Sequence, residues 1–176
     1  MPEVAIVLGS DSDLPKVKDC FSLLDEFGVS FEIIVSSAHR TPDSTKTWAA
    51  SLRERGVRVV IAVAGGAAHL PGVVASYTTL PVIGVPVETP VAGGLDSVLS
   101  ILQMPAGIPV ATMPVGKSGG TNAALFAISI LALATDAYAL RLEEYRRKMA
   151  RGITEKNEKL QSIGYKDYIQ GIEAKK

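Results

Sequence analysis

The sequence predicts an α/β fold, a doubly wound three-layer α/β/α sandwich with a central sheet of five parallel strands. Two observations predict it. Short runs rich in valine and isoleucine alternate with segments of helical periodicity, and these runs are almost continuously apolar. Continuous apolar runs are typical of parallel strands whose two faces are both covered by helices. The predicted strands are residues 4–8, 31–35, 58–64, 81–87 and 109–115.

Capping residues and apolar spacing predict the helices of the N-terminal half. Gly28 ends the first helix, because glycine adopts a positive φ at low cost. Thr41 and Pro42 predict the start of the second helix, with threonine as the N-cap and proline at the first helical position, and Gly56 closes it. The first helix buries an apolar stripe of Val17, Cys20, Phe21, Leu24 and Phe27.

One long helix is predicted from Asn122 to Met149, with an interruption at Gly152. Its apolar run, residues 123–134, is too short to span a bilayer, and a helix that is apolar on all sides is buried on all sides. Residues 151–176 are expected to form an amphipathic helical tail on a single α/β domain of residues 1–176. Pairs of opposite charge four residues apart stabilise the polar end of the long helix, namely Glu143 with Arg147 and Glu144 with Lys148.

Composition favours a small ligand, or a second copy of the chain, as the partner. Lys plus Arg and Asp plus Glu both number 18 in 176 residues, so no net charge attracts nucleic acid or an anionic membrane. Hydrophobic residues make up 47% of the chain, a high share that favours self-association. The lone cysteine, Cys20, excludes an internal disulfide, and the N-terminus shows no signal-peptide pattern. We therefore expect a cytoplasmic protein.

Residues suited to chemistry gather where the predicted strands end, which is where ligands bind in an open parallel sheet. Both histidines of the chain, His39 and His69, follow strands there. On the residues alone, each could equally be a structural histidine. Arg40 places a fixed positive charge at a helix start whose first amides lack partners, an arrangement suited to an anion, although a solvated arginine fits as well. Gly65 and Gly66 permit close approach of a ligand to the backbone, or serve only a tight turn.

Three other kinds of site are not supported by the residue pattern. Two histidines and a distant cysteine have no recognised metal-ligand spacing, so no metal site is predicted. A serine hydrolase is not predicted, because neither histidine has an obvious orienting acid in the sequence. The segment Gly116-Lys117-Ser118 looks like the end of a nucleoside-triphosphate loop, but that motif requires glycine where Ala111 stands.

Four segments, taken in order, resemble a known family. The sequences GSDSD, SAHRTPD, AGGAAHLPG and QMPAGIPV resemble those of the bacterial-type N5-carboxyaminoimidazole ribonucleotide mutases of purine biosynthesis, and the resemblance covers residues 4–147. It implies a flavodoxin-like sandwich that assembles as a homo-octamer. It also implies a small ribonucleotide as substrate and a reaction that needs no cofactor: no metal, ATP or biotin.

The resemblance also implies roles for single residues at the phosphate and sugar end of the substrate. Ser10, Ser12 and Arg40 would hold the 5′-phosphate, and Asp13 would bind the ribose hydroxyls. A carboxylate accepts hydrogen bonds from both hydroxyls, so the negative charge of this turn would select the sugar.

At the other end of the substrate, the resemblance makes His39 the general acid and base. Gly66, Ala67 and His69 would line the imidazole and carboxylate end, with His69 as a second catalytic residue, or alternatively a hydrogen-bonded wall. Ser37 and Leu70, from the same two motifs, complete the expected substrate site. Carbon dioxide released from the carbamate would be held in the pocket and added again at C4, which gives it a high effective molarity.

Two other functions remain open. A second branch of the family carboxylates aminoimidazole ribonucleotide directly, but it usually has lysine after the first histidine and a motif similar to AGRSN in place of the second. Arg40 and His69 therefore favour the mutase. Ser36, where valine is frequent, and the helix start at residues 119–121 depart slightly from the pattern. The third reading is a non-catalytic nucleotide-binding module on the same fold.

Overall fold

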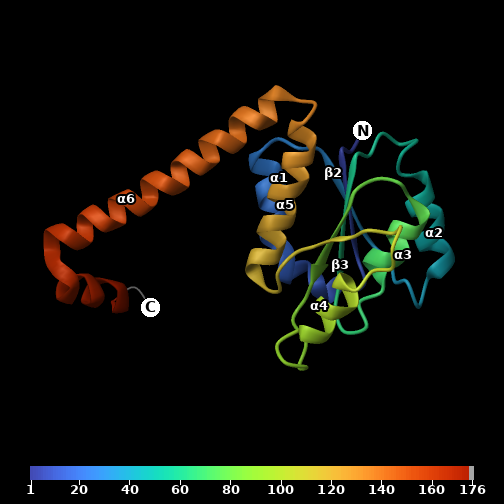
Figure 1. Ribbon diagram of the computed structural model, residues 1–176, viewed down its shortest axis with the longest axis horizontal. Coiled ribbons are helices and arrows are strands. Elements are labelled where there is room, and N and C mark those ends of the chain that lie inside the picture. The colour runs from blue at the N-terminus through green and yellow to red at the C-terminus, as the bar shows by residue number, and fades with distance from the viewer. Residues whose placement is uncertain (175–176) are drawn as a thin grey trace. The chain divides into compact units, whose positions relative to one another are not determined.

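The computed structural model describes residues 1–174 and contains one sheet of five parallel strands (Figure 1). The strands are β1 (Val4–Leu8), β2 (Phe31–Val35), β3 (Val59–Ala64), β4 (Val82–Pro86) and β5 (Ala111–Thr112). Their order in the sheet is β2-β1-β3-β4-β5, which is the order of flavodoxin-like doubly wound folds. The predicted fold class is confirmed.

Helices cover both faces of this sheet. The 3-10 helix η1 (Asp11–Val17), α1 (Lys18–Glu26) and α5 (Lys117–Ala132) lie together on one face (Figure 1). The other face carries α2 (Pro42–Ser51), α3 (Leu70–Tyr77) and α4 (Leu95–Leu102). These three helices contribute Ala49, Val74 and Ile101 to one buried cluster that also contains Val60 and Ala62 of β3. The predicted stripe on α1 is also confirmed at Cys20, Leu24 and Phe27, which are buried.

The carboxyl ends of the central strands lie level with one another. Leu8 at the end of β1 pairs with Val35 of β2 and with Val63 of β3, and Ala64 of β3 pairs with Pro86 of β4. The loops that leave these four strands therefore start at the same edge of the sheet. The direction of winding reverses between β1 and β3, which is the place where such sheets bind ligands.

The edges of the sheet differ from the prediction. The fifth strand is shorter than the predicted residues 109–115 and contains only Ala111 and Thr112, because Pro109 and Pro114 have no N–H to donate to a neighbouring strand. At the opposite edge, Ile33 and Val35 of β2 are exposed, so helices do not cover both faces of every strand as the apolar runs predict.

The predicted long helix from Asn122 to Met149 is wrong, because the chain breaks between α5 and α6 (Asp136–Glu173). Leu133 and Ala134 donate to carbonyls three residues earlier, which tightens and ends α5. The chain stays helical through Gly152, and the glycine with a non-helical conformation is Gly164. The predicted interruption at Gly152 is absent. This position also places no steric demand for glycine, since a Cβ there would meet nothing within 4 Å.

The chain divides into two units, Met1–Tyr138 and Ala139–Lys176. The first contains the sheet and the helices that cover it, and the second contains α6 beyond its first residues. In the second unit, Arg147 contacts Glu143 as predicted, but Glu144 pairs with Arg147 and Arg151 instead of Lys148. Within residues 1–174, every helix is too short or too polar to cross a membrane.

Candidate active site

A cavity of about 540 Å³ opens at the carboxyl ends of β1 to β4. Its walls come from the loops that follow these four strands, as expected from the level strand ends. Every predicted site residue except Ser12 lines it, namely Ser10, Asp13, Ser37, His39, Arg40, Gly66, Ala67, His69 and Leu70. The sheet thus brings together side chains that are up to sixty positions apart in the sequence, from Ser10 to Leu70.

The turn after β1 is organised by its own hydroxyls. Ser10 is the N-cap of η1, and its Oγ accepts a hydrogen bond from the Ser12 amide and lies 2.8 Å from Ser12 Oγ. Asp11 is exposed and accepts a hydrogen bond from the same amide. Ser12 is exposed and does not line the cavity, and it contacts Ser10 within the turn.

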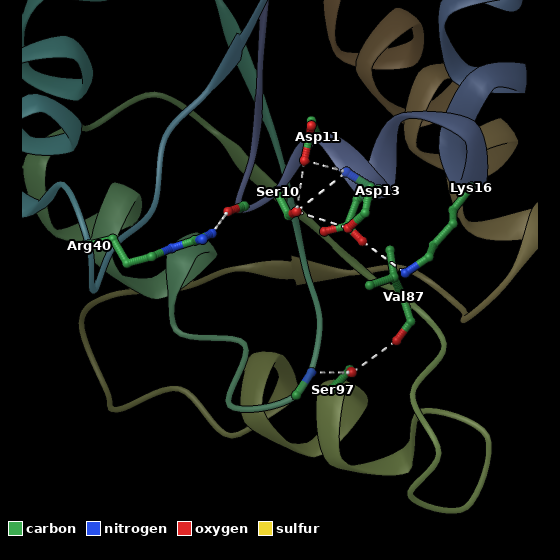
Figure 2. A network of polar contacts seen from close by, with 10 residues as sticks. Ser10, Asp11, Asp13, Lys16, Arg40, Val87 and Ser97 are labelled. Carbon is green, nitrogen blue, oxygen red and sulfur yellow. Dashed lines mark hydrogen bonds and ion pairs between the residues drawn. The ribbon is translucent and has the colours of Figure 1, made fainter.

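The second acid of this turn, Asp13, is 6% exposed and lines the cavity. Lys16 donates to its Oδ1 at 2.9 Å from three positions later in η1 (Figure 2). Lys16 also lines the cavity, although no motif of the sequence indicates it. Its spacing from Asp13 is visible in the sequence, but only the 3-10 conformation of residues 11–17 places residues three apart directly above one another.

The loop after β2 is held by threonine and serine hydroxyls. Thr41 Oγ1 accepts from the Ser37 amide at 3.0 Å and donates to the Ser37 carbonyl at 3.1 Å. The buried Ser36 hydroxyl lies 2.7 Å from Thr45 Oγ1 on α2. Thr41 is the N-cap residue as predicted, but its hydroxyl caps no helix amide because the loop uses it. These contacts fix the loop that carries His39 and Arg40.

The two histidines contact each other across the cavity. His39 Nε2 lies 2.7 Å from His69 Nδ1, and the ring planes are nearly perpendicular, at 82°. One facing nitrogen must donate and the other accept, so the two rings share a proton between them. A proton taken up by one ring can therefore pass to the other. The geometry allows either ring to act as an acid or a base.

Arg40 lies on another wall of the cavity, in the loop after β2. Its guanidinium donates to the Gly9 carbonyl at 2.8 Å, and Figure 2 shows it on the opposite side of Ser10 from Lys16. One of five N–H donors is used in this bond, so several remain for an anion. The cavity therefore has fixed cations on two sides, Arg40 and Lys16, and carboxylates in Asp13 and Glu88.

A buried serine fixes the loop after β3. Ser97 Oγ on α4 accepts from the Gly66 amide at 2.9 Å and donates to the Val87 carbonyl at 2.9 Å (Figure 2). This amide is therefore used within the protein, and Gly66 lines the cavity without offering its N–H. The neighbouring Gly65 has to be glycine, since a Cβ there would lie 2.6 Å from Val87 Cγ2. The sequence does not predict the role of Ser97, because an isolated serine in a helix gives no signal.

Other chemical groups lie outside this arrangement. Among residues 1–174, no group of three or more His, Cys, Asp and Glu is placed to hold a metal ion. Burial raises the pKa of the Cys20 thiol to about 12, so it is protonated and a poor nucleophile at neutral pH. Lys117 is exposed and 3.6 Å from Asp19, outside the cavity that holds the histidines.

The chain is similar to proteins of one family throughout its length. Residues 3–152 match the family model described as AIR carboxylase. The N5-carboxyaminoimidazole ribonucleotide mutase of Thermotoga maritima is 52% identical over 96% of this chain and 98% of its own length. The phosphoribosylaminoimidazole carboxylase of Saccharomyces cerevisiae is 46% identical over 96% of this chain, which spans 29% of that longer protein.

Solved structures agree with the sequence matches. The crystal structure of Treponema denticola PurE superimposes with a TM-score of 0.81 at 30% identity, covering 91% of this chain and 99% of that one. The crystal structure of a PurE2 variant from the same organism gives a TM-score of 0.80 at 29% identity, covering 90% of this chain and 98% of that one. Both likenesses extend over the sheet and its helices.

Proposed function

Because the chain belongs to the AIR carboxylase family, we propose that it is an N5-carboxyaminoimidazole ribonucleotide mutase of purine biosynthesis. The reaction converts its substrate to 4-carboxy-5-aminoimidazole ribonucleotide. The observation that carries the proposal is the contact between His39 and His69 in a cavity at the strand ends, in a chain about half identical to proteins of that name.

The reaction needs one proton delivered and one removed. The N–C bond of the carbamate breaks, the nitrogen takes up a proton, and carbon dioxide leaves. A C–C bond then forms at C4, and the proton on C4 departs to restore the aromatic ring. Since the two proton transfers cancel, a single imidazole can perform both, and we assign this role to His39. His69 exchanges protons with it over 2.7 Å.

The remaining residues hold the substrate. We assign Arg40 and Ser10 to the 5′-phosphate, with Ser12 supporting Ser10 across 2.8 Å, and Asp13 to the ribose hydroxyls. Ser37, Gly66, Ala67 and Leu70 are the walls near the imidazole and carboxylate end. Carbon dioxide released between these walls and the bound substrate stays beside C4, where its effective concentration far exceeds that of the dissolved gas.

Direct carboxylation of aminoimidazole ribonucleotide is the second candidate, because the yeast relatives at 46% and 49% identity are named carboxylases. A labelling experiment separates the two. Substrate with a labelled carbamate carbon is converted in unlabelled bicarbonate, and the mutase retains the label in the product. Complete loss of the label would exclude the mutase. If wild type and His39→Asn bind the nucleotide equally well and neither turns it over, the protein is a binding module.

We further propose a homo-octamer in the cytoplasm. Self-association is supported by α4, where Leu95, Leu99 and Leu102 are exposed at helical spacing on one face while Ile101 is buried on the other. Phe126 of α5 is also exposed. The cytoplasm fits a chain whose single cysteine is buried and unpaired. Sedimentation equilibrium tests the octamer, and an 18.5 kDa monomer at micromolar concentration would exclude it.

A further inference from the structure

We propose that Lys16 is a positioning residue for sugar recognition: it fixes the carboxylate of Asp13 so that its second oxygen faces the ribose hydroxyls. The inference rests on the proposed function, because that function places the ribose at Asp13. It concerns a residue that none of the family motifs quoted above includes.

The first step is the contact itself. Asp13 is 6% exposed, and among residues 1–174 the one side-chain partner of its carboxylate is the ammonium of Lys16, 2.9 Å from Oδ1. The terminal torsion of an aspartate is broad and weakly restrained by itself. A charge-assisted hydrogen bond to one oxygen restrains that torsion and fixes where the other oxygen points.

The second step is the backbone that carries the pair. Asp13 and Lys16 lie three residues apart in η1, and in a 3-10 helix such side chains are stacked directly above one another. Asp13 also donates its amide to the Ser10 carbonyl, so the turn that bears the carboxylate is itself held in place. Lys16 therefore reaches Asp13 without a flexible loop between them. Figure 2 shows the lysine side chain extending from η1 to the carboxylate.

The third step concerns charge. The cavity contains the carboxylates of Asp13 and Glu88 and would receive a substrate with a phosphate and a carbamate. Arg40 donates to Gly9 on the far side of Ser10, so it does not neutralise Asp13. Lys16 is the cation that compensates Asp13, and its own side chain is 43% exposed, so water completes its solvation. The pair presents a hydrogen-bond acceptor to the sugar at little electrostatic cost to an anionic ligand.

The test measures sugar discrimination with two simple ligands, ribose 5-phosphate and 2-deoxyribose 5-phosphate. Their dissociation constants are measured by titration calorimetry on the full chain, so the result does not depend on turnover. Wild type should prefer ribose, because the deoxy sugar lacks one of the two hydroxyls that would donate to the carboxylate of Asp13. In Lys16→Met this preference should fall about five- to tenfold, and Lys16→Arg should restore most of it.

Controls decide between this role and two simpler ones. Lys18→Met, a neighbouring exposed lysine outside the cavity, should bind like wild type. Asp13→Asn should lose the preference too, and the double variant Lys16→Met with Asp13→Asn should lose no more than Asp13→Asn alone. Equal weakening of both sugars in Lys16→Met would show that Lys16 is only a charge for phosphate and would overturn the proposal. An unchanged preference would overturn it too.

The result is separable from the function of the enzyme. If wild type binds both sugar phosphates but does not convert N5-carboxyaminoimidazole ribonucleotide, the proposed function fails while the role of Lys16 is still tested by the ratio of the two affinities. If conversion is normal and the ratio does not respond to Lys16, only the positioning role fails.

Discussion

The two imidazoles of this site contact each other, and no carboxylate is bonded to either among residues 1–174. In hydrolytic triads, an acid bound to the histidine fixes its tautomer. Here each ring is oriented by the other ring, so protonation can move between them. This suits a reaction that needs an acid in one step and a base in the next.

Replacing His39 by Asn tests this at the level of one residue. The amide cannot take up or release a proton near neutral pH, so we expect kcat to fall about 10²- to 10⁴-fold. The dissociation constant of the product should change little, because His39 is assigned no binding role. Steady-state kinetics and calorimetry measure the two quantities. A kcat within tenfold of wild type would contradict the assignment to His39.

Connections between elements hold the site residues in place. Ser97 joins the loop after β3 to the end of β4 by accepting from Gly66 and donating to Val87, and it is fully buried. A comparable connection is made by Thr41, which binds both backbone groups of Ser37. The cavity is thus shaped by hydroxyls that do not themselves face the ligand.

Ser97→Ala should therefore destabilise the protein and loosen the cavity. It leaves the Gly66 amide and the Val87 carbonyl without their buried partner, which costs about 1–3 kcal/mol in the free energy of unfolding. Urea denaturation measures this cost. Ser76→Ala is the matched control, because Ser76 is an exposed helical serine that donates to Val73, and its loss should cost less than about 0.5 kcal/mol. Equal effects of the two substitutions would contradict the role of Ser97.

An ion pair joins β2 to the turn after α2 and gives stability a pH dependence. Arg55 donates to Glu32 from its two terminal nitrogens, Nη1 at 2.7 Å and Nη2 at 2.6 Å, and Trp48 donates to the same carboxylate. The hydrogen bond from Arg55 is the main reason that the pKa of Glu32 lies below its ordinary value. A carboxyl whose pKa is lowered by folding stabilises the folded state above its unfolded pKa, and that contribution is lost as pH falls through the folded pKa.

Arg55→Met should therefore destabilise the protein at pH 7 more than at acidic pH. We expect about 1 kcal/mol at pH 7, since the pair is partly exposed, and a difference that shrinks as the pH falls through the lowered pKa of Glu32. Denaturation midpoints of wild type and variant across pH 3–8 measure the difference. A pH-independent difference would show that Arg55 stabilises by packing alone.

The sequence predicted the elements that have strong local patterns and missed those set by tertiary contact. Continuous apolar runs located β1 to β4, and their shared edge brought His39 and His69 together as expected. The limits of β5 depend on its pairing with β4, which Pro109 and Pro114 restrict. The break between α5 and α6 has no glycine or proline to mark it. Lys16 lies in the site because residues 11–17 form a 3-10 helix, and the spacing of apolar residues in the sequence does not distinguish this conformation from an α-helix.

At the scale of the whole molecule, exposed apolar residues on α4 predict assembly. Leu99→Glu places a charge between the exposed side chains of Leu95 and Leu102 on α4. Burying that charge in an interface is unfavourable, so we expect smaller oligomers than wild type forms. Sedimentation velocity measures the change. Lys18→Glu serves as a control for added negative charge, because its side chain is exposed on a polar position of α1. An unchanged sedimentation coefficient for Leu99→Glu would exclude this face from the interface.

The placement of the cavity at four strand ends also affects when the chain can bind its ligand during synthesis. The walls come from segments that end near Arg40, Leu70 and Thr89 as well as from the first turn, so a nascent chain shorter than 89 residues lacks part of the site. Ligand binding is therefore a late event that reports on the pairing of β1 to β4 as a whole. A ligand that binds only the fully paired sheet should stabilise each of these strands against unfolding, including strands that it does not contact.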